Sequence, residues 1–257
     1  MEKFTQRYEI DYQGLGKDLK VGFPRLMYYV QETSIRHSDS TKYTMKWYSD
    51  NKKGWVLTSW SVKVHKRPKL KDMITVKTYP TRFLGAIGDR AFEMFDSSGA
   101  PILTALSAWV FLDLEKQSFI KPSEELIKEY GPLFPEPMEK PNSFTLISKL
   151  PGIYSLASKR EFTVYRRDID ANSHVNNVKY IEWAFDDIPE DIYQSCWTQD
   201  LHVNYKKQCR TGDRVIAEFY QMKGSPLTCV TLIKSAEAPN ALIAEIYSKW
   251  REKDERN

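Results

Sequence analysis

Apolar residues recur at helical spacing in two segments, one in each half of the chain, at 23–37 and 177–185. In both segments they are three or four positions apart, which places them on one face of a helix. The residues that follow this spacing are Phe23, Leu26, Met27, Val30, Val178, Ile181 and Phe185. We therefore expect one amphipathic helix in each half, and the similarity of Tyr-Ile-Glu at 180–182 to Tyr-Val-Gln at 29–31 indicates how the two helices align.

Downstream of each helix the pattern changes to an alternation of apolar and polar residues, which is typical of strands with one buried face. Residues 61–79 and 202–220 each predict two strands joined by a short basic turn. Two further strands follow in each half, separated by the turn sequences SSGA and EAPN. These strands cover 89–96, 101–114, 227–236 and 241–252. Each half thus predicts a strand, a long helix and then four or more antiparallel strands.

The two halves also match residue by residue at a constant separation. SVKVHKRPKLKDMITVKTY (61–79) aligns with HVNYKKQCRTGDRVIAEFY (202–220), so each residue of the second segment lies 141 positions after its counterpart. The identical pairs are Val62 and Val203, Lys66 and Lys207, Asp72 and Asp213, and Tyr79 and Tyr220. Such a repeat indicates two copies of one structural unit, and the constant separation argues against a pair of unrelated α+β domains.

Between the halves, residues 121–144 predict a short helix and then a proline-rich stretch that cannot continue a sheet. We place an N-terminal unit at 1–135, a linker at 136–155 and a C-terminal unit at 156–257. A long helix with one apolar face, wrapped by a curved antiparallel sheet with an apolar inner face, is the hotdog arrangement. The sequence therefore predicts an α+β protein with the double hotdog fold, in which two hotdog units follow one another in the chain.

The composition is that of a globular protein and gives no sign of metal or cofactor chemistry. With 257 residues, 41% of them apolar, the chain is long enough to build substantial cores. No apolar run follows the mixed-charge start MEKFTQRYEI, and no stretch approaches ~18 consecutive apolar residues, so we expect a cytoplasmic protein without a membrane span. Cys196, Cys209 and Cys229 lack CxxC spacing, which indicates neither a disulfide framework nor a cysteine zinc site. We expect no cofactor and no metal.

Basic residues gather in two places, although the formal net charge of +4 is modest for this length. Residues 63–71 hold five Lys or Arg, and a second cluster consists of Lys206, Lys207, Arg210 and Arg214. Both clusters are compatible with a solvated surface and with an acidic partner. No zinc-finger, helix-turn-helix or aromatic-glycine RNA-binding pattern accompanies them, which argues against nucleic acid as the partner.

Short polar side chains concentrate at 166–185, RRDIDANSHVNNVKYIEWAF, at the start of the second helix. One interpretation is a capping loop, because Asp, Asn and Ser side chains satisfy the free amides of a helix start. The other is a reactive site: Asp170, Asn172 and His174 alternate, so an extended loop would point all three to one side. Capping does not require that arrangement, which adds weight to the second interpretation.

The second interpretation has a consistent chemistry. If the helix starts at 175–177, its free N–H groups and positive dipole end face the same space, and the amides of Val175 and Asn176 become donors for an oxyanion. His174 is able to move a proton, and Asp170 is able to act as base or to hold the imidazole in one tautomer. Such a set suits the hydrolysis of an acyl compound, whose carbonyl oxygen gains negative charge.

Covalent catalysis is less consistent with the sequence. No GxSxG elbow occurs and Ser173 lacks a glycine-framed turn, which argues against a serine nucleophile. Cys209 with His174 as its partner is an alternative nucleophile. A lone cysteine on a strand, however, is more often simply a small buried residue.

The segment RRDIDANSHVNNVKYIEW resembles the D-x-N-x-H-V-N-N-x-x-Y-I motif of the plant and bacterial acyl-acyl carrier protein thioesterases. In that family a Y-x-x-E-C segment follows downstream, and NYKKQC at 204–209 is similar to it. FPRLMYYVQE and SAWVFLDLEK look like segments of the family's first hotdog unit, so the resemblance covers nearly the whole chain. It implies a double hotdog protein that hydrolyses fatty acyl-carrier protein thioesters and releases free fatty acid in fatty acid biosynthesis.

Carried over residue by residue, the resemblance implies Asp170, Asn172 and His174 as catalytic residues, with Gln208 at the fourth position. The family usually has glutamate there, and glutamine can neither take a proton nor stabilise a charged imidazole as a carboxylate does. Asp170 would then have to take the proton in place of this glutamate. By strand parity, only one of Gln208 and Cys209 faces the site.

The first half has neither histidine nor asparagine in its corresponding loop, GLGKDLKVGF, so we expect it to be a non-catalytic partner that shapes the acyl pocket. Candidate residues for this pocket are Met27, Val30 and Trp60. Candidate contacts for the acidic acyl carrier protein are Lys66, Arg67, Lys206, Lys207 and Arg210.

Three alternatives to the carrier-linked thioesterase remain. The same fold carries acyl-CoA hydrolysis and the hydration of enoyl thioesters. The third alternative is a non-catalytic acyl-binding protein that has lost turnover, which Gln208 in place of glutamate would also fit. Pairing of two chains into a homodimer is a further expectation.

Overall fold

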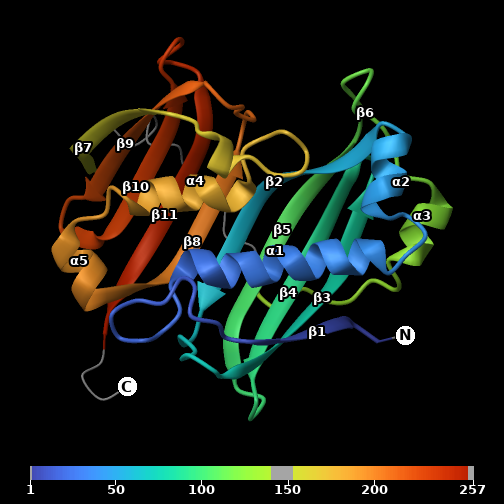
Figure 1. Cartoon of the computed structure of the whole chain (residues 1–257), viewed down its shortest axis with the longest axis horizontal. Coiled ribbons are helices and arrows are strands. Elements are labelled where there is room, and N and C mark those ends of the chain that lie inside the picture. The colour runs from blue at the N-terminus through green and yellow to red at the C-terminus, as the bar shows by residue number, and fades with distance from the viewer. Residues whose placement is uncertain (1, 140–152, 254–257) are drawn as a thin grey trace. The chain divides into compact units, whose positions relative to one another are not determined.

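Residues 2–139 and 153–253 are described by the computed structural model of this protein. The chain divides into unit 1, Met1–Lys140, and unit 2, Pro141–Asn257. Each unit contains a helix on one face of an antiparallel sheet (Figure 1). No helix within the described residues is both long and apolar enough to span a membrane.

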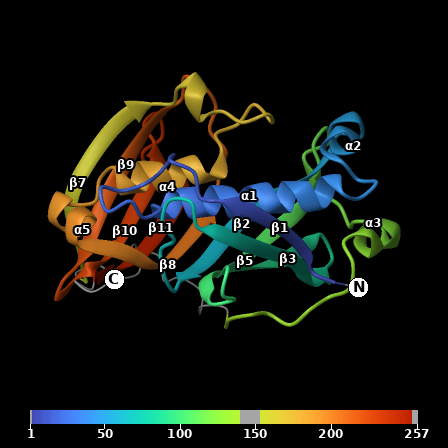
Figure 2. The same ribbon diagram turned by 60° about the horizontal axis from the view of Figure 1, so that its bottom comes forward.

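Unit 1 is built from a long helix and an antiparallel sheet. Its elements are β1 (Phe4–Glu9), α1 (Phe23–Asp39), α2 (Met45–Asp50), β2 (Lys53–Val64), β3 (Met73–Leu84), β4 (Ile87–Asp96), β5 (Pro101–Asp113), β6 (Ser118–Phe119) and α3 (Glu124–Glu129). The strands lie in the order β1-β3-β4-β5-β2, and the short strand β6 pairs with β5. α1 crosses one face of this sheet, and β1 lies beside β3 (Figures 1 and 2).

Unit 2 repeats this plan with a shorter helix. Its elements are β7 (Tyr154–Thr163), a 3₁₀ turn (Arg166–Asp168), α4 (Asn177–Phe185), α5 (Glu190–Ser195), β8 (Cys196–Tyr205), β9 (Arg214–Met222), β10 (Ser225–Ser235) and β11 (Leu242–Glu252). The strands lie in the order β8-β11-β10-β9-β7, with antiparallel neighbours. α4 packs against β9, β10 and β11 (Figure 1).

Both predicted helices are present and bury the expected faces. On α1, the side chains of Leu26, Met27 and Val30 are at most 1% exposed. α4 likewise buries the apolar residues that its spacing predicted, and it begins at Asn177, within the predicted range. Each unit therefore has the hotdog arrangement, and the predicted double hotdog fold is confirmed.

The loops that lead into α1 and α4 have the same backbone hydrogen bonds. The corresponding bonds, donor first, are Gly16–Lys20 and Asp170–His174, Val21–Pro68 and Val175–Cys209, and Gly22–Gly14 and Asn176–Asp168, each at 2.9 Å. Corresponding loop residues lie 154 positions apart (174 − 20), while Pro68 and Cys209 are 141 apart, as the sequence repeat predicts. Most of this difference of 13 residues (154 − 141) arises because α1 has 17 residues and α4 only 9.

This correspondence corrects the predicted alignment of the two helices. Gly22 and Asn176 are the N-caps of α1 and α4, so the counterpart of Tyr29 is Trp183 (183 − 29 = 154) and not Tyr180. The prediction was three residues out of register. A shift of three residues is close to one helical turn, so it preserves the apolar face and the sequence pattern cannot detect it.

The boundary between the units is only partly described. The predicted short helix is α3, Glu124–Glu129. The predicted linker, 136–155, includes residues 140–152, which lie outside the described residues, so its extent stays a prediction. β7 begins at Tyr154, just before the predicted start of the C-terminal unit at 156.

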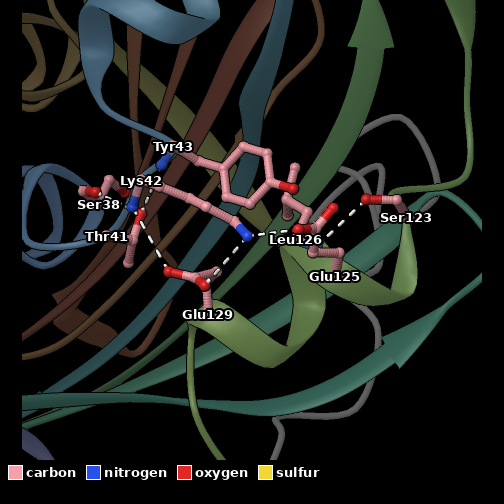
Figure 3. A network of polar contacts seen from close by, with 8 residues as sticks. All are labelled: Ser38, Thr41, Lys42, Tyr43, Ser123, Glu125, Leu126 and Glu129. Atoms are coloured by element: carbon pink, nitrogen blue, oxygen red, sulfur yellow. Dashed lines mark hydrogen bonds and ion pairs between the residues drawn. The ribbon is translucent and has the colours of Figure 1, made fainter.

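A polar network around Lys42 holds α3 close to the end of α1 (Figure 3). The Lys42 ammonium pairs with Glu125 and Glu129 of α3, and its backbone N–H donates to Glu129 at 3.4 Å. The hydroxyl of Ser38, near the end of α1, lies 3.1 Å from that of Tyr130, which directly follows α3. Tyr130 is 4% exposed, so the network fixes a buried aromatic side chain.

Arg67 closes the helix-entry loop of unit 1. Its guanidinium forms a two-pronged ion pair with Asp18 at 2.6 and 3.3 Å, and it donates to the carbonyls of Val21 and Lys20 at 2.8 and 2.9 Å. Gly16 leaves room for the pair, because a Cβ there would lie 2.9 Å from an Asp18 carboxylate oxygen. Only 12% of the Arg67 side chain is exposed, so Arg67 holds the loop together from inside the unit. Its prediction as a surface contact for acyl carrier protein is therefore wrong.

Two largely buried histidines make the stability of the protein depend on pH. Burial and the Arg90 charge lower the pKa of His37 to about 3, and burial lowers the pKa of His202 to about 4. The unfolded chain binds these protons near pH 6.5, so between about pH 6.5 and 4 it binds more protons than the folded protein. We expect the free energy of unfolding to be about 2 kcal/mol lower per histidine at pH 5 than at pH 7.5.

Urea unfolding at the two pH values measures this loss, and the His37→Gln variant assigns it. About half of the pH-dependent loss should disappear in the variant, because His202 still contributes the remainder. An unchanged pH dependence in the variant would show that His37 does not carry the effect.

The Arg67→Gln variant is expected to lower the free energy of unfolding by about 2–3 kcal/mol, because it removes a mostly buried ion pair and two charge-assisted hydrogen bonds. Lys66→Gln is the matched control, since Lys66 pairs with Asp96 and its side chain is 44% exposed. The control should cost less than about 1 kcal/mol. Urea denaturation of both variants is the measurement, and equal losses would contradict the internal role of Arg67.

Candidate functional site

The motif loop of unit 2 closes on itself just before α4. The Asp170 N–H donates to the carbonyl of His174 at 2.9 Å, and the Ser173 N–H donates to the carbonyl of Asp170 at 3.1 Å. An Asp170 carboxylate oxygen accepts the Asn172 N–H at 2.8 Å. Asp170 and His174 therefore face each other across a tight turn that carries Asn172.

This loop is not extended, so the prediction that alternation places the three side chains on one side is wrong. Ser173 has a φ of 63°, in the left-handed region, and this reverses the chain. The short polar residues suit such a turn, because an aspartate side chain readily accepts the amide two residues further on. Asp170 and His174 are half-buried and Asn172 is exposed. The turn, and not strand alternation, brings Asp170 and His174 opposite one another.

The start of α4 offers fewer free amides than the sequence predicts. The Val175 N–H donates to the carbonyl of Cys209 and the Asn176 N–H to that of Asp168, so the prediction of both as oxyanion donors is wrong. Asn176 is the N-cap, which confirms the capping interpretation for this residue. The N–H of Asn177 has no hydrogen-bond partner within residues 2–139 and 153–253, so the first free donor lies one position further along.

Gln208 and Cys209 lie in the loop after β8, which ends at Tyr205, so strand parity does not apply to them. Only one of the two is buried all the same: Cys209 is 1% exposed, whereas Gln208 is exposed. The Cys209 N–H donates to the hydroxyl of Tyr180 at 3.0 Å, and its carbonyl accepts the Val175 N–H at 2.9 Å. These bonds hold Gln208 next to the motif loop.

Cys209 has the properties of a structural residue. Burial raises the pKa of its thiol to about 11, so it is protonated at neutral pH, while a nucleophilic cysteine reacts as the thiolate. No hydrogen bond joins its sulfur to His174 in the described part of the chain. Both observations argue against the cysteine nucleophile, and the backbone of Cys209 is what positions the loop.

Unit 1 shows how side chains at these loop positions converge. The corresponding pairs are Asn172 and Asp18, Gln208 and Arg67, and Asp170 and Gly16. In unit 1, Asp18 and Arg67 contact each other at 2.6 Å, and a Cβ on Gly16 would touch the Asp18 carboxylate. Because the two loops share their backbone hydrogen bonds, we expect the side chains of the three predicted residues of unit 2 to converge in the same way. Neutral amides replace the ion pair there.

Backbone hydrogen bonds, and not bonds between side chains, hold together the described loops that carry the predicted catalytic residues. Among the described residues, no hydrogen bond joins the side chains of Asp170, Asn172, His174 and Gln208 to one another. Nor do these residues contain a group of three or more His, Cys, Asp or Glu placed to hold a metal ion. The arrangement therefore offers a carboxylate, an imidazole and two amides to a water molecule and a carbonyl group.

The predicted acyl-pocket residues are core residues of unit 1. Met27, Val30 and Trp60 are at most 2% exposed, and Trp60 packs against Phe92 with ring centroids 5.2 Å apart. None of the three lines the cavity that Trp55, Phe83 and Arg90 border in unit 1. Their role in binding an acyl chain stays a prediction.

The remaining predicted carrier contacts lie on the surface. Lys206, Lys207 and Arg210 are exposed in the loop that carries Gln208. Lys66 is partly exposed and is paired with Asp96. The hollow beside Gln208 is of mixed charge, since Asp213, Arg214 and Glu237 line it together with Lys207. The basic character is thus confined to the exposed side chains of the loop.

Two residues that support the site were not singled out from the sequence. Asp168 is 6% exposed; its carboxylate accepts the Tyr165 N–H at 2.9 Å, and its carbonyl accepts the Asn176 N–H. The hydroxyl of Tyr180 holds Cys209 and is itself buried, which raises the pKa of Tyr180. Both residues lie within the motif segment at 166–185. In the sequence, however, each looks like an ordinary helix-entry or core residue, so neither was identified as part of the site.

Comparison with known proteins assigns both units to one family. The acyl-ACP thioesterase N-terminal domain model matches residues 1–130, and the acyl-ACP thioesterase C-terminal domain model matches residues 155–252. Oleoyl-acyl carrier protein thioesterase 1, chloroplastic, of Arabidopsis thaliana is 26% identical over 231 residues, which cover 83% of this chain and 61% of that protein. The chain spans about half the length of other curated relatives.

Solved structures show the same fold. An acyl-ACP thioesterase from Bacteroides thetaiotaomicron matches with a TM-score of 0.82 at 19% identity, over 96% of this chain and 97% of that chain. The 12:0-ACP thioesterase from Umbellularia californica matches with a TM-score of 0.81 at 20% identity, over 97% of this chain and 94% of that chain. On the match of both domain models, this chain belongs to the acyl-ACP thioesterase family.

Proposed function

We propose that this protein hydrolyses the thioester bond of fatty acyl carrier protein and releases free fatty acid in fatty acid biosynthesis. The observation that carries the proposal is the bond from the Val175 N–H to the carbonyl of Cys209 at 2.9 Å, which holds the motif loop next to Gln208. Membership of both units in the acyl-ACP thioesterase family supports the same reaction. The reaction needs water and no cofactor.

In this proposal, water attacks the carbonyl carbon of the thioester. A C–O bond forms, the C–S bond breaks, and the proton taken from water passes to the leaving thiolate, so that fatty acid and free carrier thiol are the products. Asp170 and His174, facing each other across the turn, position the water and take its proton. The Asn172 amide and the Asn177 N–H donate to the oxygen that gains negative charge.

Gln208 completes the hydrogen-bond network around the water. Its amide is both a donor and an acceptor, but it cannot take a proton, so the base function rests on Asp170 and His174. Gln208 is exposed, which argues against a role as a buried structural amide. Glutamine at this position is therefore compatible with turnover.

A non-catalytic protein that binds fatty acyl thioesters is the second candidate. The observation that favours it is the neutral Gln208 where the family usually has a carboxylate. Such a protein would bind the substrate and release no thiol. The presence of Asp170, Asn172 and His174 together favours the enzyme, with acyl-CoA as the alternative substrate.

We propose a cytoplasmic location and a homodimer as the assembly. Cys196, Cys209 and Cys229 are free and buried, which fits a reducing compartment. Cell fractionation tests the location, and sedimentation velocity tests the assembly.

The His174→Ala and Asp170→Asn variants are each expected to lower kcat by about tenfold or more, because general-base assistance contributes about 10²–10⁴-fold. The measurement is thiol release from acyl carrier proteins of several chain lengths, beside the matching acyl-CoAs. His65→Ala, an exposed histidine of unit 1, is the matched control and should leave kcat unchanged. Near-normal turnover in both site variants would remove these residues from the mechanism.

The same panel separates the enzyme from the binding protein. Faster release from carrier-linked substrates than from acyl-CoA supports the proposed substrate. Binding without release identifies the non-catalytic candidate, and a Gln208→Glu variant that gains turnover would then trace the loss to this position. If the wild-type protein is active, Gln208→Glu should keep that activity, because the side chain is exposed.

The exposed basic residues beside the site are expected to contact the acidic carrier. The double variant Lys206→Gln, Arg210→Gln should raise KM for acyl carrier protein severalfold and leave KM for a small acyl thioester unchanged. Added salt should shrink the difference, because it screens exposed charges. Lys63→Gln, an exposed lysine of unit 1, is the control. An equal change in KM for both substrates would contradict the contact.

A further inference from the structure

Unit 1 contains a cavity of about 410 Å³, including its open mouth, between α1 and the sheet. Its lining comes from α1, β2, β3, β4 and β5, and from Tyr130 after α3. None of the residues proposed for thioester hydrolysis belongs to it. The cavity combines an aromatic wall with a single unbalanced positive charge.

The positive charge is that of Arg90 on β4. Its Nη1 donates to Nδ1 of His37 at 2.8 Å and to the hydroxyl of Thr78 at 3.1 Å, and its guanidinium carbon lies 5.1 Å from the centre of the Tyr130 ring. Burial lowers the pKa of Arg90, but a guanidinium stays protonated in proteins. A charge held in this way costs free energy unless it is paired.

No carboxylate pairs with Arg90 within residues 2–139 and 153–253. Asp89 also lines the cavity, but its carboxylate accepts the Arg82 Nε–H at 2.6 Å. His37 is neutral above its lowered pKa of about 3, and burial raises the pKa of Tyr48, so neither supplies a negative charge. The described groups around Arg90 therefore leave one positive charge unbalanced.

The aromatic wall is fixed in place. A Cβ on Gly88 would lie 3.0 Å from the Trp55 ring and 3.1 Å from the Phe83 ring, so the glycine lets both rings approach β4 closely. Tyr130 is positioned through α3, which the polar network around Lys42 holds (Figure 3). The wall is thus preformed, as ligand cavities in proteins usually are.

We propose that this cavity binds a monocarboxylate with a compact apolar body. The carboxylate pairs with Arg90, whose planar fork matches its geometry, and the body lies against Trp55 and Phe83. Because part of the 410 Å³ is open to solvent, the enclosed space admits only a small acid. The site uses residues of unit 1 only and does not rest on the proposed hydrolysis.

The test is a titration of the wild-type protein, followed by calorimetry and by tryptophan fluorescence, since Trp55 lies in the wall. The probes are octanoate and benzoate, their neutral counterparts octanamide and benzamide, and inorganic phosphate. Each carboxylate that fits should bind about tenfold or more tightly than its amide, because a charge-assisted pair replaces a neutral contact. Whichever of octanoate and benzoate binds more tightly shows whether the natural acid is alkyl or aryl. Phosphate has no apolar body and should bind most weakly.

Arg90→Met keeps the volume and removes the charge, and it is expected to abolish the preference for carboxylate over amide. Arg90→Lys keeps the charge without the planar fork and should retain part of the preference. Arg7→Met, on an exposed arginine of β1, is the matched control and should bind as the wild type does. Equal binding of carboxylates and amides by the wild-type protein would overturn the proposal, and so would an Arg90→Met variant that keeps the preference.

Discussion

In each unit, a single backbone hydrogen bond sets the geometry of the loop that leads into the helix. In unit 2 it runs from Val175 to Cys209, and in unit 1 from Val21 to Pro68, each at 2.9 Å. It joins the residue before the helix cap to the loop that follows the first strand after the helix, β2 in unit 1 and β8 in unit 2, so it fixes where the helix begins over the sheet. The loop before the helix must then turn back on itself, which places its side chains beside those of the neighbouring loop.

The two units use this loop geometry for different purposes. In unit 1 the ion pair of Asp18 and Arg67 occupies the space between the loops and satisfies the backbone carbonyls around it. In unit 2 the corresponding positions are the amides of Asn172 and Gln208, which do not bond to each other within the described residues. A site that leaves polar groups unpaired gives up stability and gains groups for a substrate. The same reasoning applies to the Arg90 cavity, where the protein leaves a charge unbalanced.

Much of the fold followed from local patterns. The spacing of apolar residues identified α1 and α4, and the constant separation of the two halves identified the repeat, because both depend only on periodicity along the chain. The candidate residues Asp170 and His174 came from the motif and its resemblance to a family. Periodicity could not fix the register between the helices, since a shift of one turn leaves the apolar face unchanged.

The sequence by itself thus determined the two hotdog units, their repeat and the residue types at the candidate site. Only the tertiary structure decided how those residues are used. The turn at Ser173 replaces the extended loop, the Val175 amide is taken by the distant Cys209 carbonyl, and Arg67 points inward to an aspartate. Each of these depends on hydrogen-bond partners distant in the chain or on a backbone angle, and residue type and spacing do not specify either.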